Sequence, residues 1–178
     1  VAAVPMHLWA PDVYEGSPSP VTAFFSVGPK AAAMAAILRV FVDGLGVVPY
    51  VERWTVIWAV ISAASMTLGN LVALQQNNIK RMMAYSSIAQ AGYILVGVAA
   101  SGLQSTQGIS AVLFYLMAYA VTNLGIFAII THLDQEGGWV SVDDYRGLAF
   151  RHPLYAWALL LFFVSLIGIP PTVGFLGK

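Results

Sequence analysis

The sequence predicts an all-α fold, namely a polytopic bundle of transmembrane helices in which prolines break some of the helices. Of the 178 residues, 59% are hydrophobic and only 9% are charged, whereas soluble domains carry about 25% charged residues. The sequence also contains several apolar runs close to the roughly 20 residues that are needed to cross a bilayer. We therefore expect one membrane domain over residues 1–178.

The composition excludes several classes of function. The formal net charge is zero and the sequence has no basic run, which argues against a nucleic-acid partner. The chain contains no cysteine, so it cannot form disulfides, thiolate zinc sites or thiolate-held iron–sulfur clusters. Sequence motifs of nucleotide-binding loops, nucleophile elbows and zinc proteases are also missing. We therefore expect no catalytic centre, metal or cofactor on this chain, and we expect its chemistry to be the movement of ions or protons.

Residues 1–20 are expected to form a broken-helix or interfacial segment at the membrane edge. Several prolines in this segment prevent one continuous helix. His7, Asp12 and Glu15 lie among these prolines and are candidates for a role in the loop. Two interpretations stay open, an interfacial anchor with aromatic residues at headgroup level and a hinge between two half-helices.

The first complete span is expected over about residues 21–42, with Lys30 near its middle. Placing a lysine at the bilayer centre costs roughly 2.5–3.5 kcal/mol on insertion scales, so such a residue is a functional hypothesis by default. Pro29 removes one backbone N–H and crowds the preceding turn, which predicts a loosened helix at this point. A lysine removed from water can release and regain a proton. The alternative is a structural ion pair with an acidic residue elsewhere.

Four further spans are expected over about residues 55–74, 82–100, 110–130 and 154–178. Hydroxyl and amide groups on the third and fourth spans, among them Gln90 and Tyr93, are candidates for a hydrophilic path. They can instead serve as helix–helix hydrogen bonds. The last span is expected to break at Pro170 and Pro171, which are hinge candidates. It leads to Lys178, a second candidate for proton translocation, for which snorkelling at a helix end is the alternative.

The distribution of basic residues predicts the orientation in the membrane, and the two ends of the sequence indicate whether it is part of a longer protein. Basic residues concentrate in the loops at about 75–81 and 132–153, which predicts that both loops lie on the cytoplasmic side of the membrane. The chain begins without methionine and stops within an expected helix. We therefore expect an internal fragment of a longer membrane protein.

Three stretches of the sequence resemble a known family. They are residues 7–18 (HLWAPDVYEGSP), 78–93 (NIKRMMAYSSIAQAGY) and 168–178 (GIPPTVGFLGK). In this order they are similar to motifs of subunit N, an antiporter-like membrane subunit of proton-pumping NADH:quinone oxidoreductase, respiratory complex I. The first stretch favours subunit N over its paralogues, and the resemblance extends over the whole chain.

The resemblance implies an antiporter-like (Mrp-type) fold and a non-redox subunit of an H⁺-translocating NADH:quinone reductase. Lys30 matches the channel lysine of the family's eighth helix, and Lys178 matches the lysine on its broken twelfth helix. NADH, FMN and iron–sulfur clusters would lie on other subunits, with quinone bound elsewhere in the complex. The implied partners are the other membrane and peripheral subunits and the lipid bilayer. The implied location is the bacterial inner membrane, or alternatively an organellar energy-coupling membrane.

The sequence departs from the family pattern at one position, and one alternative function stays open. Many members of the family have histidine where this chain has Gln90, and glutamine cannot titrate. The alternative function is that of a subunit of an Mrp-type cation/proton antiporter or of a membrane-bound hydrogenase. Glutamate occupies the position of Lys178 in some of those paralogues, which favours the first reading.

Overall fold

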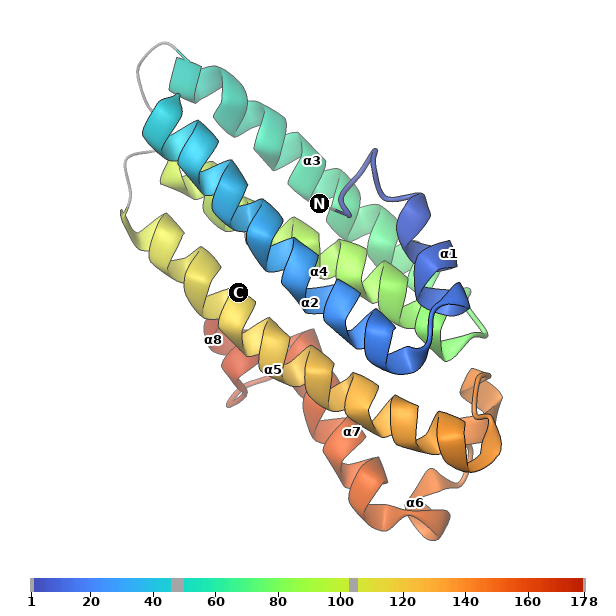
Figure 1. The fold of residues 1–178 in the computed structure, drawn as a ribbon. Helices are drawn as coiled ribbons and strands as arrows, with labels where there is room; N and C mark the ends of the chain where they lie inside the picture. The colour runs from blue at the N-terminus through green and yellow to red at the C-terminus, as the bar shows by residue number, and fades with distance from the viewer. Residues whose placement is uncertain (1, 46–49, 103–105, 178) are drawn as a thin grey trace.

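The protein is a bundle of helices in a computed structural model that describes residues 2–45, 50–102 and 106–177 (Figure 1). Within these residues no strand is present. The long helices are α2 (Ser19–Leu38), α3 (Tyr50–Ala73), α4 (Ile79–Ser101) and α5 (Thr106–Gly137), and α7 (Pro153–Ile167) is shorter. The remaining elements are the short helices α1 (Trp9–Gly16), α6 (Leu148–Arg151) and α8 (Val173–Gly177) and the turns η1 (Arg39–Gly44) and η2 (Val142–Tyr145).

Four helical stretches are long and apolar enough to cross a membrane. They cover residues 19–44, 50–73, 79–101 and 107–137, and α7 is apolar but shorter. The chain is therefore a membrane protein with an all-α transmembrane fold, as the sequence predicted. Helices α4 and α5 extend at both ends beyond the apolar runs from which their spans were predicted. The largest extension is in α5, where Asp134 remains helical because its carboxylate meets polar partners on neighbouring elements.

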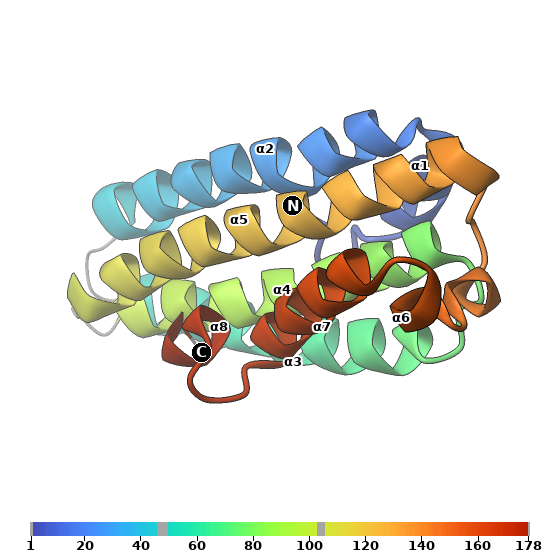
Figure 2. The same ribbon diagram turned by 90° about the horizontal axis from the view of Figure 1, so that it is seen from below.

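Helix α4 lies at the centre and packs against α1, α2, α3 and α5. Small residues allow a close approach to α3. A Cβ atom added at Gly92 would lie 2.9 Å from the Ser62 carbonyl oxygen, and the Ser62 hydroxyl donates a hydrogen bond of 2.7 Å to the Gly92 carbonyl. Such small-residue contacts are typical of helix packing in membranes. Helices α2 and α5 lie side by side, with α7 against α5 (Figure 2).

The predicted loosening at Pro29 and the predicted break at Pro170 and Pro171 have different outcomes. Helix α2 runs through Pro29 without interruption from Ser19 to Leu38, so the predicted loosening does not end the helix. A proline removes only one N–H, and surrounding groups in transmembrane helices can compensate for it. In contrast, α7 ends at Ile167 and is followed by Gly168 with φ +84°, by Pro170 and Pro171, and by α8. Lys178 lies outside the described residues.

The two loops rich in basic residues meet at one end of the bundle. The backbone N–H of Ile79 donates to the Val140 carbonyl at 3.0 Å, and the N–H of Val142 donates to the Asn77 carbonyl at 2.8 Å. These bonds surround a bridge between Asn78 and Ser141. Both loops therefore lie at the same end of the bundle.

Candidate functional site around Lys30

Lys30 is buried in the bundle, with only 5% of its surface exposed. Its Nζ donates hydrogen bonds to the Ser87 carbonyl at 2.7 Å, to the Ser87 hydroxyl at 2.6 Å and to the Tyr119 hydroxyl at 3.2 Å. Nζ also lies 4.3 Å from the centre of the Tyr119 ring. All of these partners are neutral, and no ion pair to Lys30 occurs within the part of the chain that the structure describes.

The partners of Lys30 suit both protonation states of its amine. An ammonium has three N–H donors, and Ser87 and Tyr119 together offer three acceptor oxygens. A neutral amine can instead accept a hydrogen bond, and both hydroxyls are able to turn and donate one. The site can therefore hold Lys30 with or without its extra proton, and no large rearrangement is needed.

A polar stripe runs along α2 from Lys30 to the loop end of the bundle. Ser19, Thr22 and Ser26 precede Lys30 at intervals of three or four residues, and all are buried. This spacing places them on one face of the helix. Met34 and Leu38 continue the same face beyond Lys30 and are also buried, so the stripe becomes apolar in that direction.

Each polar residue of this stripe has a partner. The Asn123 amide of α5 donates to the Ser26 hydroxyl at 2.5 Å. The Ser19 hydroxyl donates to the Asp134 carboxylate at 2.8 Å, and the same oxygen of Asp134 lies 3.4 Å from Lys80 Nζ. Polar groups thus extend from the charged pair at the loop end to within one helical turn of Lys30.

Helix α1 reaches the same site through Tyr14. The hydroxyls of Tyr14 and Ser87 are 3.2 Å apart and hydrogen-bonded. Tyr14 has only 2% of its surface exposed, and its ring packs edge-on against Phe127. Burial raises the pKa of Tyr14 to about 12, and the bond to Ser87 offsets this only in part. Its hydroxyl therefore stays protonated at neutral pH and helps to fix the position of Ser87.

On the other side of Lys30, the polar groups lead toward the break after α7. Tyr115 lies one turn before Tyr119 on α5, and its hydroxyl donates to the side-chain oxygen of Gln90. The Gln90 amide nitrogen donates to the carbonyl of Leu166, near the end of α7, at 3.2 Å. Gln90 and Tyr115 are both buried, with 5% and 4% exposure.

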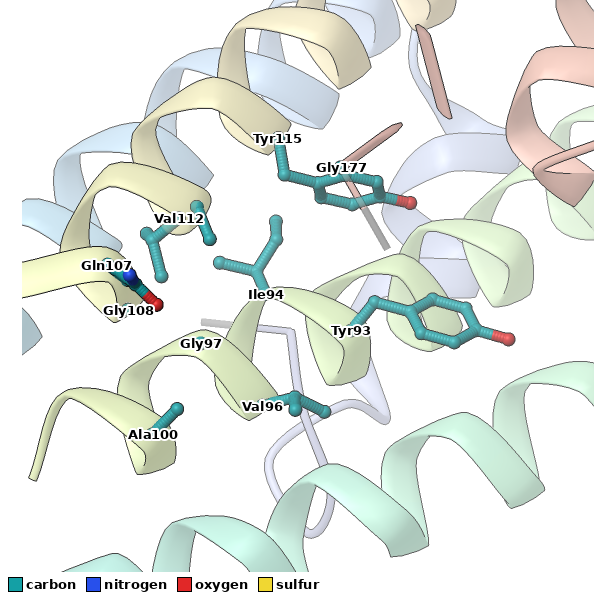
Figure 3. A pocket seen from close by; sticks show the side chains of 11 residues that line it. Tyr93, Ile94, Val96, Gly97, Ala100, Gln107, Gly108, Val112, Tyr115 and Gly177 are labelled. Atoms are coloured by element: carbon teal, nitrogen blue, oxygen red, sulfur yellow. The ribbon is translucent and has the colours of Figure 1, made fainter. Parts of the chain in front are cut away.

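Two cavities lie beside this second group. One has a volume of about 280 Å³ and is lined by Tyr93 of α4, Tyr115 of α5 and Gly177 of α8 among others (Figure 3). The other has a volume of about 680 Å³ and includes Gln90, Tyr93 and Ser86 in its lining. One water molecule occupies about 30 Å³ in the liquid. Both cavities therefore have room for several water molecules next to polar groups.

The predicted site residues fall into separate groups. Lys30 and Gln90 lie on the polar route described above, and Tyr93 lines the adjacent cavities. Pro29 is exposed although it precedes Lys30. Pro170 and Pro171 form the break between α7 and α8 and are exposed.

The three loop candidates lie around α1. Asp12 and Glu15 both accept hydrogen bonds from Arg81, at 2.9 and 2.6 Å. His7 is buried, and its Nδ1 has no hydrogen-bond partner among the described residues. Asp12 and Glu15 therefore hold α1 against the start of α4 through Arg81.

Three residues of the site, Tyr14, Ser19 and Ser26, were missing from the predicted candidates. Ser87, Tyr119 and Asn123 belong to the hydroxyl and amide groups that were predicted on the third and fourth spans. A usable signal was present in the sequence, because Ser19, Thr22, Ser26 and Lys30 recur at helical spacing, as do Tyr115, Tyr119 and Asn123. The contacts of Tyr14 and Ser87 had no such signal, since they depend on how separate helices pack. No group of three or more metal-ligating side chains occurs within residues 2–45, 50–102 and 106–177.

Comparisons with known proteins agree on one family. All 178 residues match the family described as NADH:quinone oxidoreductase/Mrp antiporter, TM. The chain is 83% identical to NADH-quinone oxidoreductase subunit N 2 of Symbiobacterium thermophilum, and the match covers 100% of this chain and 35% of that protein. The chain therefore spans about a third of the length of this relative.

Two solved structures have the same fold. One is a chain of respiratory complex I from Thermus thermophilus with bound aureothin, with a TM-score of 0.79 and 38% identity over 99% of this chain and 37% of that chain. The other is a chain of the Mrp complex from Dietzia sp. DQ12-45-1b, with a TM-score of 0.85 and 32% identity over 99% of this chain and 32% of that chain. Both are chains of multi-subunit complexes.

Proposed function

Because this chain belongs to the NADH:quinone oxidoreductase/Mrp antiporter transmembrane family, we propose that it is part of a proton-translocating membrane subunit of an NADH:quinone oxidoreductase. In this proposal the subunit is non-redox, and quinone reduction elsewhere in the complex drives proton movement past Lys30. The high identity to a subunit N supports the oxidoreductase over other members of the family.

The observation that carries the proposal is a buried lysine whose partners are all neutral. A charge inside a membrane is costly and is usually retained for function. A permanent structural charge would gain most from a carboxylate partner, and Lys30 has none within the described residues. Ser87 and Tyr119 accept hydrogen bonds from the ammonium and can donate to the amine, which supports repeated protonation and deprotonation.

The polar groups on both sides of Lys30 suggest a direction for the proton. The stripe of Ser19, Thr22 and Ser26 would connect Lys30 to the loop end near Lys80 and Asp134. On the other side, the proton would pass from Lys30 along Tyr119 toward the two cavities beside Gln90 and Tyr93, which have room for several water molecules. Pro170 and Pro171 would act as the hinge beyond these cavities, and Lys178 would be the next carrier.

The loop residues would have a mechanical role in this proposal. Asp12 and Glu15 hold α1 through Arg81, and α1 carries Tyr14 to Ser87. His7 lies in the turn that leads into α1 and would help to fix the position of this helix.

The whole subunit would work within a complex in the bacterial inner membrane. NADH, FMN and the iron–sulfur clusters would be bound by peripheral subunits, and quinone would be bound within the complex. Other membrane subunits and the lipid bilayer would surround this chain. The bacterial relative supports this location.

A second candidate function is that of a subunit of a cation/proton antiporter of the Mrp type. The high TM-score to a chain of an Mrp complex supports it, because a fold does not by itself distinguish one use of the site from another. Co-purification distinguishes the two candidates. The oxidoreductase predicts that the full-length subunit is isolated together with peripheral iron–sulfur proteins, and the antiporter predicts that it is not.

The proposed function is tested by replacing Lys30 with methionine in the full-length subunit within its assembled complex, reconstituted into sealed vesicles. Methionine has a similar length but cannot carry a proton. The matched control is Arg39→Met, which removes a cation from an exposed position at the end of the same helix. We expect Lys30→Met to lower proton uptake strongly and Arg39→Met to leave it unchanged. Equal proton uptake in both variants, with intact assembly, would refute the proposal.

A further inference from the structure

We propose that Asp134 is the proton-collecting residue at the loop end of the polar stripe, where it takes protons from water and passes them to Ser19 and on toward Lys30. This inference rests on the proposed function, because it names the residue through which a proton would enter the stripe.

Asp134 lies where the buried stripe meets the surface. Its side chain is 28% exposed, so it is open to water. Its Oδ2 accepts a hydrogen bond of 2.8 Å from the Ser19 hydroxyl, and Ser19 is only 3% exposed. The start of α2 and the end of α5 meet here at one end of the bundle (Figure 2). The carboxylate therefore faces water on one side and the first residue of the stripe on the other.

Lys80 fixes the carboxylate at this position. Its Nζ lies 3.4 Å from Oδ2 of Asp134 and donates to the Ser17 carbonyl at 3.4 Å. Lys80 is buried, so this cation approaches Asp134 from the protein side. Tyr145 of η2 faces the same carboxylate, since burial and then the charge of Asp134 raise the pKa of Tyr145. Lys80 and Tyr145 are thus the titratable groups that the described part of the chain brings to Asp134 from neighbouring elements.

The other acidic side chains do not offer the same connection. Within residues 2–45, 50–102 and 106–177, Asp134 is the only acidic residue that is hydrogen-bonded to the stripe. Asp12 and Glu15 pair with Arg81, and Asp143 pairs with an arginine on the surface. Asp134 is therefore the carboxylate that can connect the stripe to water.

The contact between Asp134 and Ser19 allows a proton to be handed over. A carboxylate only accepts hydrogen bonds, whereas a protonated carboxyl also has one O–H donor. A proton from a hydronium ion binds to the Asp134 carboxylate and leaves a water molecule behind. The protonated carboxyl then donates to the Ser19 oxygen, and the Ser19 hydroxyl is free to turn toward the stripe. When Ser19 passes its own proton along the stripe and takes the proton from Asp134, the carboxylate is restored.

The alternative role of Asp134 is to anchor the end of α5 through Lys80, and the two roles predict different pH dependences. A proton-collecting carboxylate matters most where free protons are scarce, so its loss should slow proton uptake more at high pH. The loss of an anchor should slow proton uptake by a factor that does not depend on pH between 6 and 8.

The test uses the full-length subunit within its assembled complex, in sealed vesicles with the loop end facing the medium. Asp134→Asn keeps the size of the side chain and an oxygen for Ser19, but it cannot take up a proton. The matched control is Asp143→Asn, because Asp143 lies in the same polar segment and its exposed side chain pairs with Arg146. Initial rates of proton uptake are compared with the parent at pH 6 and at pH 8.

A positioned acid or base accelerates a proton transfer by about 10²–10⁴-fold. Because water can replace Asp134 in part, we expect Asp134→Asn to slow proton uptake by about tenfold at pH 8 and by about threefold or less at pH 6. Asp134→Glu retains a carboxyl group and should recover most of the rate at pH 8, and Asp143→Asn should match the parent at both pH values. A parental rate in Asp134→Asn, or a slowing that is the same at both pH values, would overturn the proposal.

Ser19→Ala provides a second test that leaves the ion pair of Asp134 and Lys80 in place. It removes the hydroxyl that joins the carboxylate to the stripe, so it should slow proton uptake more at pH 8 than at pH 6. The double variant with Asp134→Asn should be no slower than Asp134→Asn alone, because both changes interrupt the same route. If Asp134→Asn does not assemble, a parental rate in Ser19→Ala at pH 8 would overturn the proposal instead.

The same assay separates this inference from the proposed function. If Lys30→Met stops proton uptake while Asp134→Asn takes up protons at the parental rate, Lys30 carries protons and Asp134 does not collect them. If Lys30→Met takes up protons at the parental rate, the proposed function fails, and the role of Asp134 fails with it.

Discussion

Replacing Ser87 by alanine should weaken proton translocation more than any other single hydroxyl deletion near Lys30. The Ser87 hydroxyl accepts a hydrogen bond of 2.6 Å from Lys30 and is hydrogen-bonded to Tyr14 at 3.2 Å. Alanine removes both bonds and leaves the Ser87 carbonyl as the nearest acceptor, at 2.7 Å. The change therefore affects the charged form of Lys30 and the position of α1 together.

The magnitude follows from the kind of hydrogen bond that is lost. A hydrogen bond to a charged group contributes about 1.5–3 kcal/mol. We expect a loss at the lower end of this range, because the backbone carbonyl of residue 87 and the Tyr119 hydroxyl still accept hydrogen bonds from Lys30. A difference of about 1.4 kcal/mol is a factor of ten. We expect proton uptake per quinone reduced to fall by up to about tenfold in Ser87→Ala.

The assay compares proton uptake and quinone reduction in sealed vesicles that contain the assembled complex. The matched control is Thr67→Ala, which removes an exposed hydroxyl of α3 that donates to the Ala63 carbonyl within the same helix. Thr67→Ala should pump at nearly the parental ratio. Indistinguishable ratios in the two variants would refute the idea that Ser87 supports the charged form of Lys30.

Two further predictions concern stability. Gly174→Ala should lower the free energy of unfolding of the subunit by an amount typical of overpacking, about 1–3 kcal/mol, because the added Cβ would overlap the Ser165 carbonyl oxygen of α7. Gly16→Ala is the control, since a Cβ at that position has no atom within 4 Å; equal effects of the two changes would contradict the packing of α8 on α7. Arg81→Gln should have a small effect that disappears at high salt, because ion pairs at exposed carboxylates contribute about 0–1 kcal/mol. A large loss of thermal stability at every salt concentration would show that α1 depends on this cluster far more than its exposure suggests.

The sequence predicted the features that depend on composition and on single residues. The apolar runs indicated a transmembrane helical fold, and the proline pair at 170–171 indicated the break after α7. Lys30 was identified because a lysine inside an apolar run is unusual whatever surrounds it. The three motifs were sufficient to indicate the family to which the whole chain belongs.

The partners of Lys30 were harder to predict, because they come from different helices. Ser87 belongs to α4, Tyr119 to α5 and Tyr14 to α1, and 57, 89 and 73 positions in the sequence separate the residues of the pairs Lys30–Ser87, Lys30–Tyr119 and Tyr14–Ser87. Pairings at such separations depend on helix packing and leave no local pattern. Pro29 was predicted to loosen its helix, and α2 nevertheless runs through it from Ser19 to Leu38.

The most direct test of the central claim replaces Lys30 by arginine in the assembled complex and measures the ratio of proton uptake to quinone reduction. Arginine keeps the positive charge but does not release a proton in proteins. If Lys30 carries protons, Lys30→Arg should lose proton uptake as Lys30→Met does, although the charge is preserved. If Lys30→Arg takes up protons at the parental ratio while Lys30→Met does not, only the charge of Lys30 matters, and its role as a proton carrier is contradicted.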